Sequence, residues 1–506
     1  MTAAKGSLRA RVFAGSLWLI ILRVLSRVLS FTGTIILARL LMPEDFGIMA
    51  MAAVAMAFLE AFTTLDLKTI LIRDVHSGRP EYDTAWTLQI IRGAILAVGI
   101  LLAGPALAHF FNEPRLLQIV PLIALALFVN GFHNTGMVDL EKEFQFQRIV
   151  FKESLTRVIM VLVQIVLAVV WRNYWALIAG IVCQSFAAVG LSFYISRYRP
   201  RLSLARFKGI FGFGKWLTAA SIAHFLREQI DALVIGRMLS PDILGAYVVG
   251  RNLVHMPSNE LVMPVGRVMF PAYAQIAGDP AALQRALLMM LGALFAVAAP
   301  ASAGIGLVSE SLILGLFGEK WLAAVDIMPI LALGAILTSI SGVFAQMVVV
   351  VGRPELGVYA QLVTLAVYVP ALIVGIDAAG AVGAATARAA TAVIALLVIF
   401  LIVSRLMGLH VRDVLAVVWR SIVALAVMAA VIVWVREAGG LFGGAAGPIW
   451  LLTQLVVAGG LAYVGVLMTL WLLQGRPKGA EEALLDMAAG ALGHRRLAFL
   501  KRRMGS

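Results

Sequence analysis

Several charged side chains stand inside long apolar stretches of this chain, at intervals that place them on one side of a helix. Arg23 and Arg27 are four residues apart in the first such stretch. Arg251, His255 and Asn259 repeat that interval in a later one, and residues four apart lie on one face of an α-helix. Arginine suits a phosphate ligand, because its planar guanidinium binds two oxygens and stays charged when partly desolvated. This pattern predicts a cationic, hydrogen-bonding cavity.

Ionisable side chains in apolar stretches long enough to cross a membrane are costly, and they usually face an aqueous cavity or a bundle interior. We expect the cations that bind substrate to be Arg23, Arg27, Arg92, Arg157, Arg227 and Arg251. We expect the coupling ion, H⁺ or Na⁺, to bind at Glu60, Asp66, Glu228 or Asp231. Further polar lining is expected from His224, His255 and Asn259.

An alternative is that these charges only hold helices together. Arg227 with Glu60, or Arg251 with Asp231, would then form interhelical ion pairs. For Arg23 and Arg27 the binding role is favoured, because no nearby acid in the same stretch can neutralise them.

Other chemistries find little support in the sequence. Cys183 is the single cysteine, which excludes an intramolecular disulfide and a cysteine-based metal cluster. The stretch from Gly209 to Lys215 resembles a phosphate-binding loop, but Trp216 replaces the hydroxyl that would hold magnesium. We therefore expect no catalytic residue, no metal and no cofactor, and the chain does not look like an enzyme.

Composition predicts the elements that must position these charges. Of 506 residues 61% are apolar and only 13% are charged, with a mean hydropathy of +0.96, whereas soluble proteins are about one-quarter charged. Apolar runs of about 20 residues, enough to cross a bilayer as helices, recur throughout. The expected fold is all-α, a polytopic bundle of about fourteen spans. We place the spans at 13–37, 46–71, 85–109, 116–136, 153–171, 174–196, 214–238, 243–272, 282–308, 322–351, 354–376, 380–405, 416–435 and 449–474.

A repeat indicates how the spans are organised. Arg39-Leu-Leu-Met-Pro-Glu-Asp-Phe-Gly47 returns 198 positions later as Arg237-Met-Leu-Ser-Pro-Asp-Ile-Leu-Gly245. In each copy, proline and an acid suit the first turn of a helix. Such duplication is typical of secondary transporters with a substrate site between the repeats. We predict these parts: an N-lobe at 1–200, a C-lobe at 201–405 that begins with a basic loop, spans 13 and 14 at 406–475, and a basic tail at 476–506.

The distribution of Lys and Arg predicts the orientation. If the N-terminus is cytoplasmic, most of the 41 basic residues lie in inner connections and tails, as the positive-inside rule requires. Both termini and the basic segment 197–213 are therefore expected on the cytoplasmic side. This arrangement explains the net charge of +14 without a nucleic-acid partner.

The chain resembles the polysaccharide and oligosaccharide (O-antigen type) flippases of the multidrug/oligosaccharidyl-lipid/polysaccharide exporter superfamily. Four segments carry the resemblance: 39–47, 237–245, Glu143-Phe-Gln-Phe146 and Tyr174-Trp-Ala-Leu177. The resemblance implies a bacterial inner-membrane protein that moves undecaprenyl-pyrophosphate-linked sugar repeat units outward, for exopolysaccharide, capsule or O-antigen synthesis. It further implies two lobes of six spans that rock to give alternating access, driven by an ion gradient.

Related functions remain open at this point. A multidrug/cation antiporter of the same superfamily would need an acidic or aromatic cavity, whereas this one looks basic. A peptidoglycan-precursor (lipid II) flippase would have a similar layout. A membrane sugar polymerase or ligase is least expected, since it would need a large outer loop. Expected partners are a lipid-linked oligosaccharide and membrane lipids, with polysaccharide polymerase and export machinery as further candidates.

Overall fold

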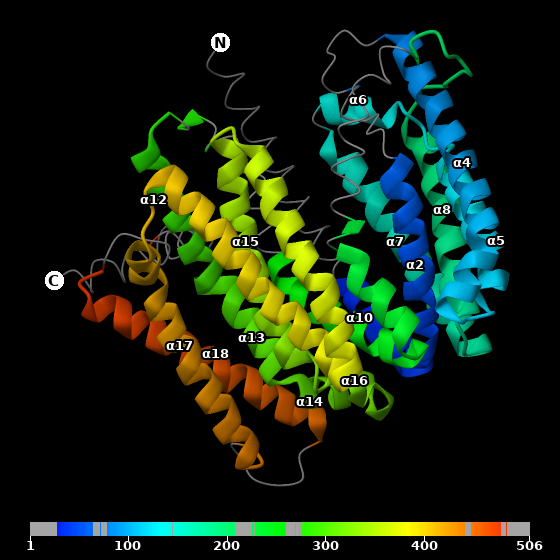
Figure 1. Cartoon of the computed structure of the whole chain (residues 1–506). Helices are drawn as coiled ribbons and strands as arrows, with labels where there is room; N and C mark the ends of the chain where they lie inside the picture. Colours follow the sequence, from blue (N-terminus) through cyan, green and yellow to red (C-terminus); the bar gives the residue numbers. More distant parts are fainter. Residues whose placement is uncertain are drawn as a thin grey trace, which may run out of the picture. The chain divides into compact units, whose positions relative to one another are not determined.

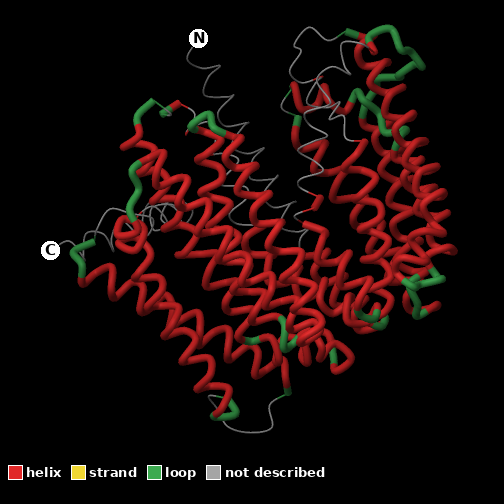
Figure 2. The backbone as a smooth tube through the Cα atoms, in the orientation of Figure 1, coloured by secondary structure: helices red, strands yellow, loops and turns green. Residues whose placement is uncertain are grey.

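The described part of the chain is helical and contains no strand (Figure 2). The structure is a computed structural model. It describes residues 28–63, 71, 78–143, 145–207, 225–226, 228–259, 269, 273, 275–276, 278–440, 447–476 and 482.

Nine helices in this described part are long and apolar enough to cross a membrane. They run over most of the stretches that the sequence predicted, so the chain is a multi-pass, all-α membrane protein. Helices suit lipid because every backbone N–H and C=O can be satisfied within one segment. The total of fourteen spans stays a prediction, because parts of the spans expected at 13–37, 46–71, 214–238 and 243–272 lie outside the described residues.

Contacts divide the chain into two compact units, Met1–Ala246 and Tyr247–Ser506. The division into two lobes with two added spans stays a prediction. In unit 1 a helix at Val28–Leu40 comes first, α4 packs along α5, and α7 packs along α8 (Figure 1). The labelled helices of this unit are α2 (Pro43–Thr63), α4 (Arg79–Phe111), α5 (Leu116–Asn130), α6 (Met137–Lys142), α7 (Phe146–Trp171) and α8 (Trp175–Ile195).

Unit 2 is built from longer helices and shorter irregular pieces. Here α15 packs along α16, and α17 packs along α18 (Figure 1). The order is α10 (Pro241–Pro257, which starts in unit 1), α12 (Pro280–Ala293), η2 (Leu294–Ala298), α13 (Ala299–Leu307), α14 (Ser309–Leu312), η3 (Ile313–Phe317), η4 (Glu319–Ala324), α15 (Met328–Val350), α16 (Pro354–Met407), α17 (Val411–Glu437) and α18 (Pro448–Leu473).

The two spans predicted at 354–376 and 380–405 form one continuous element, α16, with an interruption where the sequence placed their boundary. Ala379 has φ −147° and Gly380 has φ +55°, so neither is helical. On either side of this break the backbones nearly touch, because a Cβ on Gly375 would lie 2.5 Å from the carbonyl oxygen of Gly383. The element is therefore two helices that pack on each other, and the predicted boundary is confirmed.

The two copies of the repeated turn pack against each other inside unit 1. Both helices begin at the predicted proline, α2 at Pro43 and α10 at Pro241. A Cβ on Gly47 would collide with the carbonyl oxygen of Pro241, and a Cβ on Gly245 would collide with that of Pro43. Glycine is required at both positions because the two backbones approach too closely for a side chain.

The basic segment after α8 is held on α4. The Oδ1 atom of Asp83 accepts hydrogen bonds from the Tyr198 hydroxyl (2.7 Å) and from the backbone N–H of Arg201 (2.8 Å). Farther along α4, the Thr87 hydroxyl accepts from the N–H of Ser203 at 2.8 Å. Burial and the bond to Asp83 raise the pKa of Tyr198. Side chains of α4 thus hold the described part of the segment, 197–207.

Candidate functional site

Two of the predicted intramembrane charges meet in unit 1. Glu60 on α2 and Arg92 on α4 attract each other as opposite charges. The Nε of Arg92 also donates to the hydroxyl of Thr63, one turn beyond Glu60, at 3.3 Å. The pair of Arg227 with Glu60 that the sequence offered stays a prediction, because Arg227 lies outside the described residues. Arg92 therefore has a structural role between helices, whether or not it also binds substrate.

Arg157 is a second cation that reaches a neighbouring helix. Its Nη1 donates to the hydroxyl of Ser30 at 3.3 Å, which links α7 to the helix at 28–40. The two helices are close here, because a Cβ on Gly33 would lie 2.6 Å from Cγ1 of Val161. Arg157 thus lies beside the C-terminal part of the first predicted span.

The carboxylates predicted on the helix at 228–238 differ in burial. Asp231 is fully buried, and its Oδ1 accepts the N–H of Ala232 at 2.9 Å. Glu228, one turn earlier, is half-buried. Both have interactions with other parts of the protein.

In unit 2 the predicted stripe of Arg251, His255 and Asn259 follows α10. Arg251 and His255 are half-buried and interact with other groups, whereas Asn259 is exposed. Next to the end of the stripe, the buried hydroxyl of Ser258 accepts from the hydroxyl of Ser339 on α15 at 2.7 Å. Ser258, one residue beyond the end of α10, thus links this part of the chain to α15.

Five of the predicted site residues lie outside the described residues, and their roles stay predictions. They are Arg23, Arg27, Asp66, His224 and Arg227.

A large apolar cavity of about 510 Å³ lies in unit 2, among α13, α17 and α18. Small residues make room for it where larger side chains would fill the space between helices. Those that line it are Ala296, Ala301, Gly304, Gly459 and Gly460. Its apolar walls suit an alkyl chain, and no pattern in the sequence predicted it.

One wall of this cavity depends on an irregular helical turn. The N–H of Ala299 bonds to the carbonyl of Leu294, five residues back, rather than to that of Phe295. The Tyr463 hydroxyl on α18 donates to the freed Phe295 carbonyl at 2.7 Å. Buried carbonyls need a partner, so α18 completes the hydrogen bonding of this turn.

A smaller and more polar cavity, of about 260 Å³, lies in unit 1. It is enclosed by α4, by the turn between α5 and α6, by α6 itself and by the first turns of α7. Its polar lining consists of Gln89, His133, Asn134, Thr135, Glu141, Lys152 and Glu153. We name this space the polar cavity.

The turn that walls the polar cavity is fixed by its own hydrogen bonds. Asn134 is fully buried; its N–H donates to Ser192 Oγ at 3.0 Å and its side-chain amide donates to the Tyr198 carbonyl at 2.8 Å. Beside it, Lys152 Nζ and His133 Nε2 are 2.5 Å apart. Burial, followed by the Lys152 ammonium, lowers the pKa of His133 to about 3. The imidazole is therefore neutral at physiological pH and accepts from the lysine.

The sequence contained one weak sign of the polar cavity. The segment from Asp139 to Glu153 carries charged and apolar residues in alternation, but this pattern is equally typical of a solvated helix.

In the described residues no group of three or more His, Cys, Asp or Glu side chains could hold a metal ion.

Known proteins resemble this chain in sequence and in fold. The family described as "Polysaccharide biosynthesis protein" matches residues 36–326. The lipopolysaccharide biosynthesis protein WzxC of Escherichia coli is 26% identical over 74% of this chain and 77% of its own length. The succinoglycan biosynthesis transport protein ExoT of Rhizobium meliloti is 25% identical over 62% of this chain and 66% of its own. Among solved structures, the lipid II flippase MurJ in an inward closed conformation has a TM-score of 0.70 at 13% identity, covering 91% of this chain and all of that one.

Proposed function

This chain belongs to the polysaccharide biosynthesis protein family, and on that premise we propose that it is a flippase for undecaprenyl-pyrophosphate-linked oligosaccharide repeat units. The observation that carries the proposal is the family match over residues 36–326, joined to the transport and biosynthesis names of ExoT and WzxC. The chain is a membrane transporter and not an enzyme. The likeness to MurJ concerns the fold alone, so lipid II is not proposed as the substrate.

The three chemical parts of such a substrate correspond to three features of the chain. The pyrophosphate requires cations that keep their charge inside a membrane, for which Arg23, Arg27, Arg227 and Arg251 are the candidates. Arg157 supports this assignment, because it bonds to Ser30, which is three residues beyond Arg27. The polyprenyl chain requires an apolar groove, and the cavity of about 510 Å³ in unit 2 has the right chemistry. The sugars cross in the aqueous space that these cations line.

Transport is driven by an H⁺ or Na⁺ gradient through alternating access. Asp231 and Glu60 are the strongest candidates for the coupling site among the described carboxylates. Asp231 is fully buried, and Glu60 feels the charge of Arg92. A carboxylate in such surroundings changes its proton or sodium occupancy when a neighbouring cation moves.

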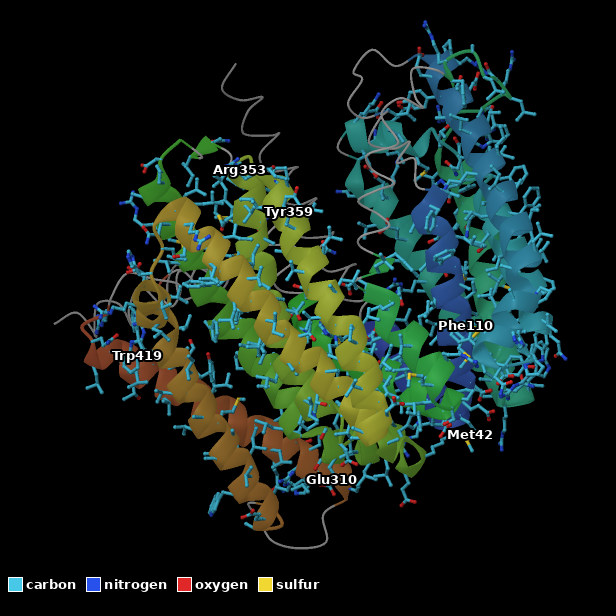
Figure 3. All side chains as sticks on the ribbon, in the orientation of Figure 1. Met42, Phe110, Glu310, Arg353, Tyr359 and Trp419 are labelled. Atoms are coloured by element: carbon cyan, nitrogen blue, oxygen red, sulfur yellow. The ribbon has the colours of Figure 1, made fainter. Side chains whose placement is uncertain are left out.

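The test is polymer export in a strain that lacks its own flippase gene, complemented with each variant. Arg23→Ala combined with Arg27→Ala should abolish export while membrane abundance stays normal. The corresponding lysine variants should retain part of it, because the charge remains without the bidentate geometry. The matched control is Arg353→Ala, an exposed arginine whose partner is its neighbour Glu355 (Figure 3). Full export by the double alanine variant would contradict the proposal.

We place the protein in the bacterial inner membrane with both termini in the cytoplasm. A cysteine at Ser203, in a chain where Cys183 is replaced by serine, should react with a membrane-impermeant maleimide only after the cells are opened. If the cysteine at position 203 is labelled in intact spheroplasts, this segment faces the periplasm and the proposed orientation is wrong.

A further inference from the structure

The polar cavity in unit 1 has a composition that distinguishes between the parts of a lipid-linked sugar. The described residues that line it include two acidic side chains, Glu141 and Glu153, and one lysine, Lys152. A phosphate placed beside these three groups would meet more acidic than basic side chains. Uncharged hydroxyl groups would find both donors and acceptors.

Its size and remaining walls favour one small ring. A volume of about 260 Å³ lies below the range of about 300–1,000 Å³ that is common for drug-sized ligands. Met137, Val138 and Ile149 supply apolar surface beside the polar groups. A pyranose presents the same combination, with hydroxyl groups around its edge and C–H groups on its faces.

The polar groups are held in place before any ligand arrives. Gln89 Nε2 donates to the carbonyls of Asn130 and His133, both at 3.3 Å. This fixes the side-chain amide and turns its oxygen away from the bonded carbonyls. Lys152 is held by the neutral His133, so its position does not depend on protonation of that ring in the physiological range. Such preorganisation lowers the entropy cost of binding.

From these observations we infer that the polar cavity binds a single sugar ring of the lipid-linked oligosaccharide, whose hydroxyl groups donate to Gln89 Oε1, Glu141 and Glu153 and accept from Lys152. This inference rests on the proposed function and deepens it, because it assigns sugar recognition to unit 1, apart from the predicted arginines. The cavity adjoins α6 and the start of α7, on the side where the basic segment is anchored to α4. It is therefore a site for the sugar on the face that the sequence predicts to be cytoplasmic.

The direct test is protection of a cysteine at the cavity. Glu153→Cys is made in the full chain with Cys183→Ser, and its rate of alkylation by N-ethylmaleimide is measured in vesicles of phosphatidylethanolamine and phosphatidylglycerol. The vesicles contain either lipid-linked repeat units extracted from a flippase-deficient strain, or bare undecaprenyl pyrophosphate, or neither. Arg148→Cys is the matched control, since Arg148 is exposed, lies five residues earlier on α7 and does not line the cavity.

We expect the sugar-bearing lipid to slow alkylation at position 153 several-fold, and the bare lipid to leave it unchanged. Position 148 should react equally in all three vesicles. Equal protection by both lipids would show a pyrophosphate or lipid site and would overturn the inference. No protection by either lipid would also overturn it.

A second measurement does not depend on the label. Glu141→Gln combined with Gln89→Ala should lower polymer export about thirtyfold or more at normal membrane abundance, as expected for two lost hydrogen bonds, one of them charged. Export equal to that of the unmodified chain would contradict sugar binding here. If the unmodified chain itself fails to restore export, the proposed function fails instead, so the two outcomes are distinguishable.

Discussion

The two copies of the repeated turn have the same backbone arrangement but are stabilised by different side chains. In both, a helix begins at proline, and a glycine four residues later meets the other copy. In the first copy Glu44 bonds to Arg115, whose guanidinium also holds Glu113 through two bonds of 2.7 Å. The second copy has Asp242 at the place of Glu44 and an isoleucine, Ile313, 198 positions after Arg115.

The helix starts differ in the same way. In the first copy Asp45 accepts the N–H of Met42 at 2.8 Å, which is one half of a capping box. In the second copy Ile243 takes the place of Asp45, so this half of the capping box is missing. Ser240 takes the place of Met42, and serine is the residue type that forms the other half, at the N-cap. The close backbone contact is thus common to both copies, whereas the local electrostatic stabilisation is specific to each.

The largest expected effect comes from removing the feature that the copies share. Gly47→Ala and Gly245→Ala should each destabilise the protein by about 1–3 kcal/mol or more, because the added methyl meets a backbone carbonyl that cannot move cheaply. The two variants should be similar, since the contact is reciprocal, and the double variant should cost less than the sum. Thermal unfolding of the purified protein, followed by tryptophan fluorescence, measures all three.

The matched control for the glycine variants is Gly190→Ala on α8, where a Cβ would meet nothing within 4 Å. It should be neutral or stabilising by about 0.5–1 kcal/mol, as expected for alanine within a helix. Unchanged stability in both Gly47→Ala and Gly245→Ala would show that the close contact is absent from the folded protein.

A smaller effect is expected from the ion pairs of the first copy. Arg115→Met leaves the buried Glu113 (5% exposed) with the backbone N–H of residue 115 but without the guanidinium, and should cost about 1–3 kcal/mol at pH 7. Hydrogen bonding from Arg115 holds the pKa of Glu113 below its usual value, against the effect of burial. This stabilisation is therefore present above the unfolded pKa of about 4.3 and is lost as the pH falls through the lower, folded value.

The free energy of unfolding should be measured from pH 7 to pH 3 for the unmodified chain and for Arg115→Met. The difference between the two should consequently become smaller toward pH 3. Asp242→Asn, in the second copy, is the control and should change stability by less than about 0.5 kcal/mol, because Asp242 is exposed. If this difference in unfolding free energy stays constant with pH, the lost stability comes from packing rather than from charge.

The smallest effect comes from giving the first copy both halves of a capping box. Met42 is 55% exposed (Figure 3), so little apolar burial is lost on replacement. Met42→Ser places a hydroxyl at the helix start while Asp45 is retained, and should stabilise the protein by about 0.5–1 kcal/mol. Met42→Ala should not stabilise it, and equal gains in both variants would rule out capping as the cause.

The helices were largely predictable from the sequence because lipid leaves the backbone few alternatives. Pro43 and Pro241 predicted two helix starts, and the break at Ala379 and Gly380 lies where a boundary was expected. Which charges meet was not predictable, since it depends on how helices rotate and pack. The interaction of Arg92 with Glu60 was not predicted for this reason.

The polar cavity was unpredictable for a related reason. Gln89, His133 and Lys152 come from two helices and a turn, and none shares a sequence pattern with the others. Their common surroundings follow from packing of α4, α6 and α7. The sequence likewise does not determine whether the predicted arginines bind substrate, and the export experiment tests this role.

The hydrogen bond from Tyr463 to the Phe295 carbonyl has a consequence for the time course of synthesis. The two residues are 168 positions apart, so at about 5–20 residues per second the carbonyl waits about 8–34 s for its partner. During that interval the irregular turn between α12 and α13 lacks the group that completes it. Insertion of α18 is thus the step at which the Phe295 carbonyl gains its hydrogen bond, and a chain that stops before Tyr463 lacks it.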